Sequence, residues 1–112
     1  MIDKINIRPV TLDDYYFCYF VRKQTMKEYI NETYGWDTKK EKENHRKYFS
    51  RTMQSKYIVE LDKEKIGLLW YVEEIDFIEL NQIFILSKFQ NKGIGSVILK
   101  DLINIGKKIR NP

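Results

Sequence analysis

The sequence predicts a single α/β domain of the α+β kind, in which an antiparallel sheet of about four strands is flanked by three helices in the order βααβββα. Three β-rich runs follow one another closely, at Lys56–Leu61, Ile66–Glu73 and Phe77–Leu86. The segments between them are too short for crossover helices, so the strands should pair antiparallel. Apolar residues then recur at helical spacing. With 112 residues, 43% of them hydrophobic, the chain has enough apolar side chains for one packed core.

The first part of the chain predicts a strand followed by a long aromatic helix. Residues 4–9 alternate and end at Pro9, as a short strand does. Thr11 is a helix cap ahead of a helix over Leu12–Glu32, with two aspartates in its first turn. Its aromatic residues either pack one face on the sheet or line an acceptor pocket or dimer contact: Tyr15, Tyr16, Phe17, Tyr19 and Phe20. Cys18 is expected to fill a helix face as a small hydrophobe.

A second helix is predicted over Thr38–Ser50. Gly35 can end the first helix, and Asp37 or Thr38 can cap the second. This helix is highly charged, and we expect Tyr48 and Phe49 to make its main apolar contacts. His45 lies in the charged segment without a matching nucleophile, so it is expected at the surface.

The second half predicts a hairpin, a third strand and a final amphipathic helix. The polar segment 62–65 is typical of a hairpin turn between the first two β-rich runs. In the final helix, one stripe should pack on the sheet; its members are Ile94, Val97, Ile98, Leu102, Ile105 and Ile109.

The segment Asn81–Ile103 carries the strongest functional signal, because it predicts a buried strand, a glycine-bearing turn and the start of a helix. Gly93 and Gly95 lack Cβ atoms, so the main chain can approach a ligand closely. The free N–H groups of the first helical turn favour a phosphate there. Neither a dinucleotide fingerprint nor a Walker loop fits the spacing. The alternative is a plain strand-turn-helix connection that uses glycines only for turn geometry.

The pattern Gln90-x-x-Gly93-x-Gly95 resembles the coenzyme A signature of the GNAT acyltransferase superfamily, (Arg/Gln)-x-x-Gly-x-(Gly/Ala). Ile83-Phe84-Ile85 stands where the family has a short IxV-type run, and the order of elements is similar across the whole chain. Ser87 and Asn91 depart from the common proline and glycine, although asparagine tolerates a left-handed conformation.

The resemblance implies an acetyl-CoA-dependent N-acetyltransferase that acts on a primary amine of a small molecule or protein. The main chain of Phe84 and Ile85 would pair with the pantetheine arm. The loop would hold the pyrophosphate; the cofactor-binding residues there are Gln90, Asn91, Lys92, Gly93, Ile94, Gly95 and Ser96.

Catalytic and acceptor residues also follow from the resemblance. Glu79 lies eleven residues before Gln90, the spacing at which one branch of the family carries its catalytic glutamate; it would be the general base. Alternatively, Glu79 is only an exposed strand residue paired with a lysine. The base would then be Glu73 or Glu74 on the neighbouring strand, or an ordered water. Tyr34, Trp36 and Asp37 are candidate acceptor contacts, with a core role for Trp36 as the alternative.

The family continues with further strands and a fourth helix, whereas this chain stops at Pro112. We therefore expect either a second copy that pairs as a homodimer through the exposed edge of the fourth strand, or a fragment completed elsewhere. The alternative function is an inactive remnant that binds coenzyme A or a partner protein.

Charge and composition bear on the remaining function classes. The net charge of +4 is spread among interleaved acids, as on a solvated helix face, and this argues against nucleic-acid binding. No apolar run is long enough to cross a bilayer and no leader is evident, so we expect a cytoplasmic location without a membrane partner. No cluster of metal-ligand residues is present in the sequence, and no metal is expected.

Overall fold

The computed structural model of the protein describes residues 5–33 and 37–110, with side chains described for residues 5–25 and 37–110. The elements follow in the order β1 (Ile5–Pro9), η1 (Leu12–Asp14), α1 (Tyr15–Thr33), α2 (Thr38–Thr52), η2 (Met53–Ser55), β2 (Lys56–Leu61), β3 (Glu64–Glu73), β4 (Ile78–Ile85), η3 (Ser87–Phe89) and α3 (Ile94–Arg110), where η marks a short 3-10 helix.

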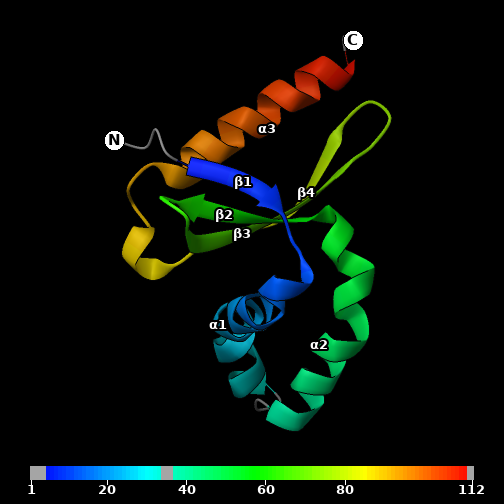
Figure 1. Ribbon diagram of the computed structural model, residues 1–112, viewed down its shortest axis with the longest axis vertical. Helices are drawn as coiled ribbons and strands as arrows, with labels where there is room; N and C mark the ends of the chain where they lie inside the picture. The colour runs from blue at the N-terminus through cyan, green and yellow to red at the C-terminus, as the bar shows by residue number, and fades with distance from the viewer. Residues whose placement is uncertain (1–4, 34–36, 111–112) are drawn as a thin grey trace.

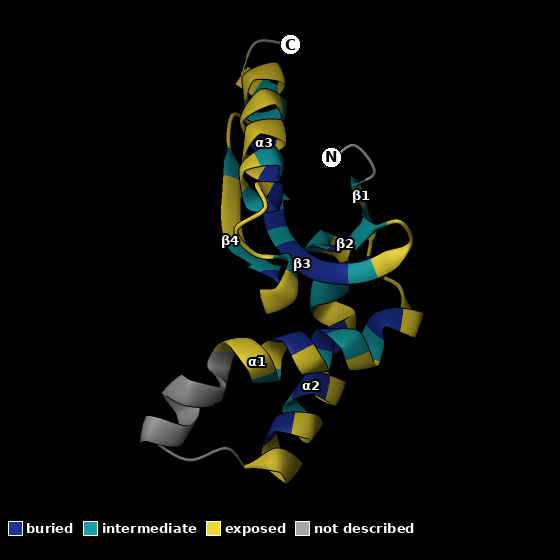
Figure 2. Ribbon diagram, turned by 90° about the vertical axis from the view of Figure 1, so that its left-hand side faces the viewer, coloured by how far each residue is buried: buried dark blue, intermediate teal, exposed yellow. Residues whose placement is uncertain are grey.

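The four strands form one antiparallel sheet in the order β1-β2-β3-β4, as the sequence predicts. Helix α3 lies on one face of this sheet, and α1 and α2 lie together on the opposite face (Figures 1 and 2). β4 is an edge strand, because within the described residues it pairs only with β3.

The β2–β3 turn is shorter than the predicted segment 62–65. Asp62 and Lys63 alone form it, both with left-handed backbones (φ of 51° and 71°), while Glu64 and Lys65 already belong to β3. Two consecutive left-handed residues match the right-handed twist of the flanking strands, and aspartate tolerates this conformation well.

β3 and β4 approach each other very closely near the end of β4. A Cβ atom placed on Gly67 of β3 would overlap the main-chain carbonyl oxygen of Phe84 and lie 2.9 Å from Cδ1 of Ile85. Glycine at this position therefore permits the close pairing. Further along the pair, Trp70 is opposite Gln82 and Tyr71 opposite Leu80, so Asn81 is the additional residue of a β-bulge.

Each face of the sheet buries its own apolar cluster. On the α3 side, Ile94, Ile98 and Leu102 are buried against the strands, which confirms the predicted stripe. On the other side, Val21 and Cys18 of α1 pack with Phe49 of α2 and with residues of β2 and β3. Cys18 is the small buried hydrophobe that the sequence predicts, and burial raises the pKa of its thiol to about 11.

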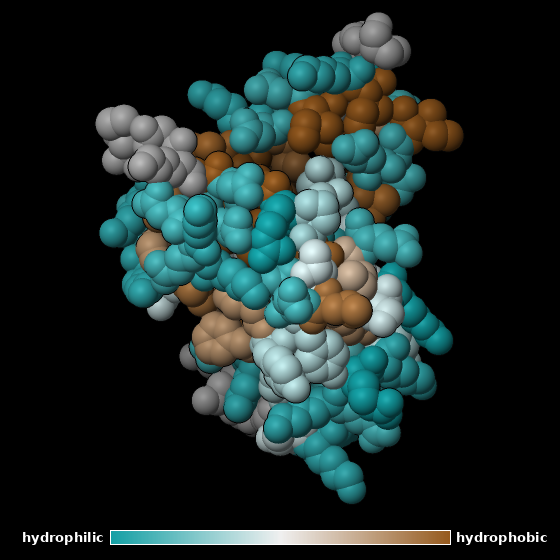
Figure 3. Space-filling model, in the orientation of Figure 1, coloured by the Kyte–Doolittle hydropathy of each residue, from teal (hydrophilic) through white to brown (hydrophobic). Residues whose placement is uncertain are grey.

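Apolar surface remains exposed where β4 faces α3 (Figure 3). A groove of about 690 Å³ lies there, and its apolar lining includes Phe77, Leu80, Leu99 and Ile103. Among these, Ile103 is 59% and Phe77 50% exposed. Among the described residues, no helix combines the length and apolar character that a bilayer span requires.

Two predictions for α2 are wrong. His45 is buried rather than superficial, with 8% of its surface exposed, and Tyr48 is 44% exposed rather than a main apolar contact. The reason is the helical period, because Glu41, His45 and Phe49 form one stripe facing α1. The His45 ring packs against Tyr15 and Phe49, and its Nε2–H donates to the main-chain oxygen of Tyr15 over 2.8 Å.

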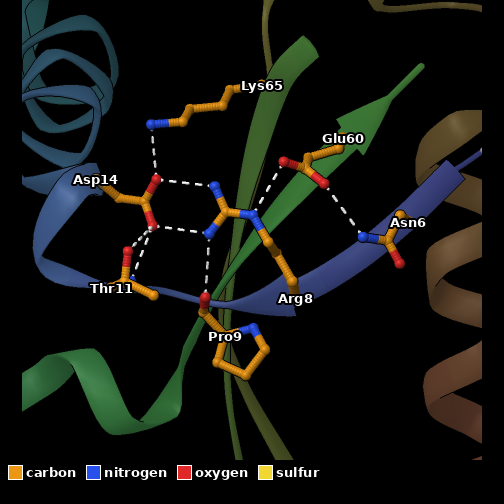
Figure 4. A network of polar contacts seen from close by, with 7 residues as sticks. All are labelled: Asn6, Arg8, Pro9, Thr11, Asp14, Glu60 and Lys65. Atoms are coloured by element: carbon orange, nitrogen blue, oxygen red, sulfur yellow. Dashed lines mark hydrogen bonds and ion pairs between the residues drawn. The ribbon is translucent and has the colours of Figure 1, made fainter. Parts of the chain in front are cut away.

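A buried ion cluster joins the start of α1 to the sheet (Figure 4). The fully buried carboxylate of Asp14 accepts hydrogen bonds from both terminal nitrogens of Arg8, at 2.9 and 3.0 Å, and lies 2.7 Å from Nζ of Lys65. It also accepts from the Thr11 N–H, so Thr11 is the helix cap that the sequence predicts. Arg8 lies on β1 and Lys65 on β3, and Arg8 continues to Glu60 on β2. One carboxylate therefore links α1 to three strands.

Replacing this carboxylate should destabilise the fold. We expect Asp14→Asn to lower the free energy of unfolding by about 3 kcal/mol at pH 7, because it leaves the partly buried Lys65 without a counter-charge and removes one of the two carboxylates that pair with Arg8. Chemical denaturation measures this, with Asp13→Asn, an exposed neighbour, as the control. Equal losses of stability in the two variants would contradict the stabilising role of the buried Asp14 carboxylate.

The same cluster predicts a pH dependence. Its cations and hydrogen bonds outweigh burial and hold the pKa of Asp14 well below its ordinary value of 3.8. The resulting stabilisation is complete above that value and is lost as the pH falls toward the depressed pKa. Between pH 5 and 2 the wild type should thus lose more stability than Asp14→Asn, as measured by denaturation at each pH.

Candidate functional site

The candidate site lies where β4 ends and α3 begins. After η3, the chain turns through Asn91 and Gly93, which both have left-handed backbones with φ of 62° and 82°. The expectation that asparagine can take the place of glycine in this loop is confirmed. Helix α3 then starts at Ile94. Alternating backbone conformations of this kind direct successive N–H groups into one concave surface.

A run of unpaired donors occupies this turn. The first helical hydrogen bond of α3 runs from the Val97 N–H to the Gly93 carbonyl over 3.1 Å. Within the described part of the chain, no acceptor is bonded to the N–H groups of residues 91–96. A Cβ atom placed on Gly95 would meet no atom within 4 Å, so the first turn of α3 is open to an approaching group. The positive end of the helix dipole adds to these donors, and together they suit a phosphate.

Gln90 supports the loop from within. Its side-chain amide nitrogen donates to the main-chain oxygen of Ile85 over 2.8 Å, which ties the loop to the last residue of β4. The amide nitrogen is therefore engaged in holding the turn.

The free edge of β4 presents main-chain groups beside this loop. The Leu86 N–H donates to the Ile66 carbonyl on β3, and the carbonyl of Phe84 also faces β3, at Gly67. Since main-chain groups alternate in direction along a strand, those of Ile83 and Ile85 point to the open edge. The Gln90 bond already uses the Ile85 carbonyl. Ile85 therefore offers its N–H, and Ile83 both groups, whereas the main chain of Phe84 is directed into the sheet.

Glu79 lies on β4 beyond the bulge at Asn81, opposite Val72. Its side chain is exposed, not partly buried. Four residues of extended strand separate it from Ile83, or roughly 13 Å. A proton from a group held at Ile83 could reach Glu79 only through water or through the acceptor itself.

Of the three predicted acceptor residues, the structure describes only Asp37. Tyr34 and Trp36 lie outside the described residues. Asp37, one of the two caps that the sequence allowed, caps α2, because its carboxylate accepts from the Lys40 N–H over 3.1 Å.

A polar cleft between the sheet and the α1–α2 pair was not predicted from the sequence. Two adjoining cavities, of about 310 and 350 Å³, share Arg22, His45, Lys56 and Trp70 in their walls. The alternation of β2 and β3 could have placed Lys56 and Trp70 on one face, but the register that makes them neighbours comes from the sheet.

Charges in the cleft are unevenly balanced. Arg22 donates to the Glu41 carboxylate over 3.0 and 3.1 Å. Burial lowers the pKa of His45, which is therefore neutral at pH 7. Burial, followed by the nearby Arg22, lowers the pKa of the Lys56 ammonium, which lies 4.6 Å from the centre of the Trp70 ring. Among the side chains of residues 5–25 and 37–110, no group of three or more histidine, cysteine or acidic residues could hold a metal ion.

Comparison with known proteins identifies relatives of this fold. The sequence model of the acetyltransferase (GNAT) family matches residues 14–111. A comparison with curated protein sequences finds no match.

Three solved structures illustrate the similarity. N-acetylglutamate synthase from Neisseria gonorrhoeae, complexed with coenzyme A and N-acetyl-glutamate, is 18% identical with a TM-score of 0.66, over 94% of this chain and 23% of that protein. A possible acetyltransferase from Clostridium difficile 630 is 16% identical with a TM-score of 0.69, over 96% of this chain and 74% of that one. The PaiA N-acetyltransferase from Thermoplasma acidophilum, in complex with coenzyme A, is 19% identical with a TM-score of 0.63, over 93% of this chain and 72% of that one.

At these identities the structural likeness establishes the fold alone. The chain spans about a quarter of the length of the N-acetylglutamate synthase.

Proposed function

The chain belongs to the acetyltransferase (GNAT) family, and we propose that it binds acetyl-CoA at the β4–α3 loop and transfers the acetyl group to a primary amine. The observation that carries the proposal is the run of unpaired N–H groups over residues 91–96 at the start of α3. Residues 1–112 would then form a single acyl-CoA-binding domain.

The loop fits the diphosphate of coenzyme A. Several N–H donors converge at one helix start, and Gly95 leaves the approach open. Structures of related proteins have been solved with this ligand, including the Thermoplasma acidophilum enzyme with coenzyme A and a Clostridium acetobutylicum protein with acetyl-CoA. The pantetheine arm would lie along the free edge of β4, where Ile83 and Ile85 present main-chain groups at the sheet edge.

The same edge supplies the chemistry of acyl transfer. The acceptor nitrogen attacks the thioester carbon, the C–S bond breaks, and the sulfur leaves as the thiolate of coenzyme A. The N–H of Ile83 or Ile85 would stabilise the negative charge that develops on the carbonyl oxygen. Glu79 would take the proton released by the amine through water, and the product amide and free thiol balance the reaction.

Coenzyme A binding should depend on the open first turn of α3. We expect Gly95→Glu to abolish the thermal stabilisation by coenzyme A, because a carboxylate there occupies the approach and repels the diphosphate. The variant itself should fold normally, since acidic residues stabilise a helix start. Thermal unfolding with and without millimolar coenzyme A measures both effects.

Gly106→Glu, on the same helix but away from its start, is the matched control and should leave the stabilisation intact. A wild-type protein that coenzyme A does not stabilise would refute the proposed function.

Removing the candidate base should slow transfer without weakening coenzyme A binding. For Glu79→Gln we expect kcat/KM to fall about a hundredfold with the thermal stabilisation unchanged, because only proton removal is affected. Thiol release with a panel of amines measures the rate. Asp101→Asn, at an exposed position on α3, is the control. Unchanged kinetics in Glu79→Gln would refute Glu79 as the base and leave a neighbouring glutamate or water in that role.

We also propose that the protein pairs with a second copy through β4. The outer half of this edge strand, Ile78–Leu80, adjoins the exposed apolar surface formed by Phe77, Leu80, Leu99 and Ile103. An unpaired edge beside apolar surface favours strand pairing. Pairing there would leave the edge at Ile83 and Ile85 to the thioester.

Light scattering coupled to size-exclusion chromatography should then give the mass of a dimer. Leu99→Lys combined with Ile103→Lys should yield a monomer, because both charges would be buried in the contact. Leu12→Lys, at an exposed position in η1, should leave the dimer intact. A monomeric wild type at high concentration would contradict the pairing.

A further inference from the structure

Three side chains form a straight row across the sheet. Lys56 on β2 is opposite Trp70 on β3, and Trp70 is opposite Gln82 on β4. They face the α1–α2 side, since each is two positions from a residue of the apolar cluster there: Lys56 from the buried Ile58, Trp70 from the buried Leu68 and Gln82 from the partly buried Phe84. The row therefore runs from the middle of the sheet to the strand whose free edge is the proposed thioester site.

The cleft described above lies over this row. The cavity of about 310 Å³ extends from Lys56 and Trp70 to the polar side chains of Asn81 and Gln82. These two residues directly precede Ile83, whose main-chain groups face the edge. A molecule in the cleft would thus have one end beside the proposed reaction centre and the other end at Lys56.

Lys56 carries a positive charge that the described residues do not balance. Arg22 is neutralised by Glu41, and both His45 and Cys18 are uncharged at pH 7. Across the part of the chain with described side chains, no carboxylate forms an ion pair with Lys56, and its contact is the face of the Trp70 ring. A half-buried ammonium group without a counter-ion is costly, and an anionic ligand would offset that cost.

We propose that this cleft holds the acceptor and selects amines that also carry a carboxylate, such as amino acids and short peptides, over polycationic amines. The proposal rests on the proposed acyl transfer. The acceptor carboxylate pairs with Lys56, and its amine lies at Asn81 and Gln82, next to the edge of β4.

The geometry also bounds the acceptor. Lys56 and Gln82 lie two strand spacings apart, or roughly 10 Å, and the ammonium reaches back over the intervening Trp70. An amine and a carboxylate separated by the length of a dipeptide fit this span. A polyamine or aminoglycoside would instead bring further positive charges toward Lys56, and the repulsion weakens its binding.

Binding of matched ligands to the chain of residues 1–112 tests the proposal. Isothermal titration calorimetry with the wild-type chain measures each affinity. Glycylglycine, glycylglycinamide and spermidine are titrated, because the first two differ only in the carboxylate. We expect glycylglycine to bind about tenfold more tightly than its amide, as a charge-assisted hydrogen bond does, and spermidine to bind most weakly.

Lys56→Met removes the charge while keeping the length of the side chain. It should abolish the preference for glycylglycine and should not lower the melting temperature, because an unbalanced buried charge is lost. Lys100→Met, exposed on α3, removes the same charge elsewhere and should keep the preference. Equal binding of the acid and the amide, a preference that survives in Lys56→Met, or no binding of either would overturn the proposal.

A separate measurement of coenzyme A binding distinguishes failure of the acceptor proposal from failure of the proposed acetyltransferase function. Stabilisation by coenzyme A without carboxylate preference refutes only the acceptor assignment. Carboxylate binding that requires Lys56, in a protein that coenzyme A does not stabilise, retains the anion site and refutes the acetyltransferase.

Discussion

The buried carboxylate of Asp14 is the interaction on which the arrangement of the domain depends. Helix α1 has no other ionic link to the sheet among the described side chains, whereas Asp14 contacts both Arg8 and Lys65 from different strands. A buried charge is tolerated only when its partners are held in good geometry. The orientation of α1 is thereby coupled to the strand register. The cleft between α1, α2 and the sheet depends on the same cluster, because α1 forms one of its walls.

Strand β4 combines two roles because a strand presents its main chain and its side chains in different directions. Its edge offers the main-chain groups of Ile83 and Ile85, while Gln82 points into the cleft on the α1–α2 side. Gly67 allows β3 to approach this strand, and the bulge at Asn81 changes the alternation before the exposed apolar end. A thioester at the edge and an acceptor in the cleft would therefore meet at a single strand.

Family membership and fold do not define the acceptor. Solved structures that share this fold at 16–19% identity include an N-acetylglutamate synthase and the PaiA N-acetyltransferase. A shared fold does not by itself define a substrate. Among the charges that face the cleft of this chain, Lys56 is the unbalanced group. The aromatic floor comes from Trp70 on β3. Tyr34 and Trp36, which the sequence suggested as acceptor contacts, lie outside the described residues.

The sequence by itself determined the order of elements, the apolar stripe of α3 and the turn at Asn91 and Gly93, because these follow from local periodicity and backbone preference. It also predicted the cap at Thr11 and narrowed the cap of α2 to Asp37 or Thr38. Only the tertiary structure decided that His45 is buried, that Asp14 is the centre of an ion cluster, and that Lys56, Trp70 and Gln82 form one row. Each of these depends on contacts between segments distant in the chain. Strand register and helix packing create such contacts, and neither is encoded in the spacing of neighbouring residues.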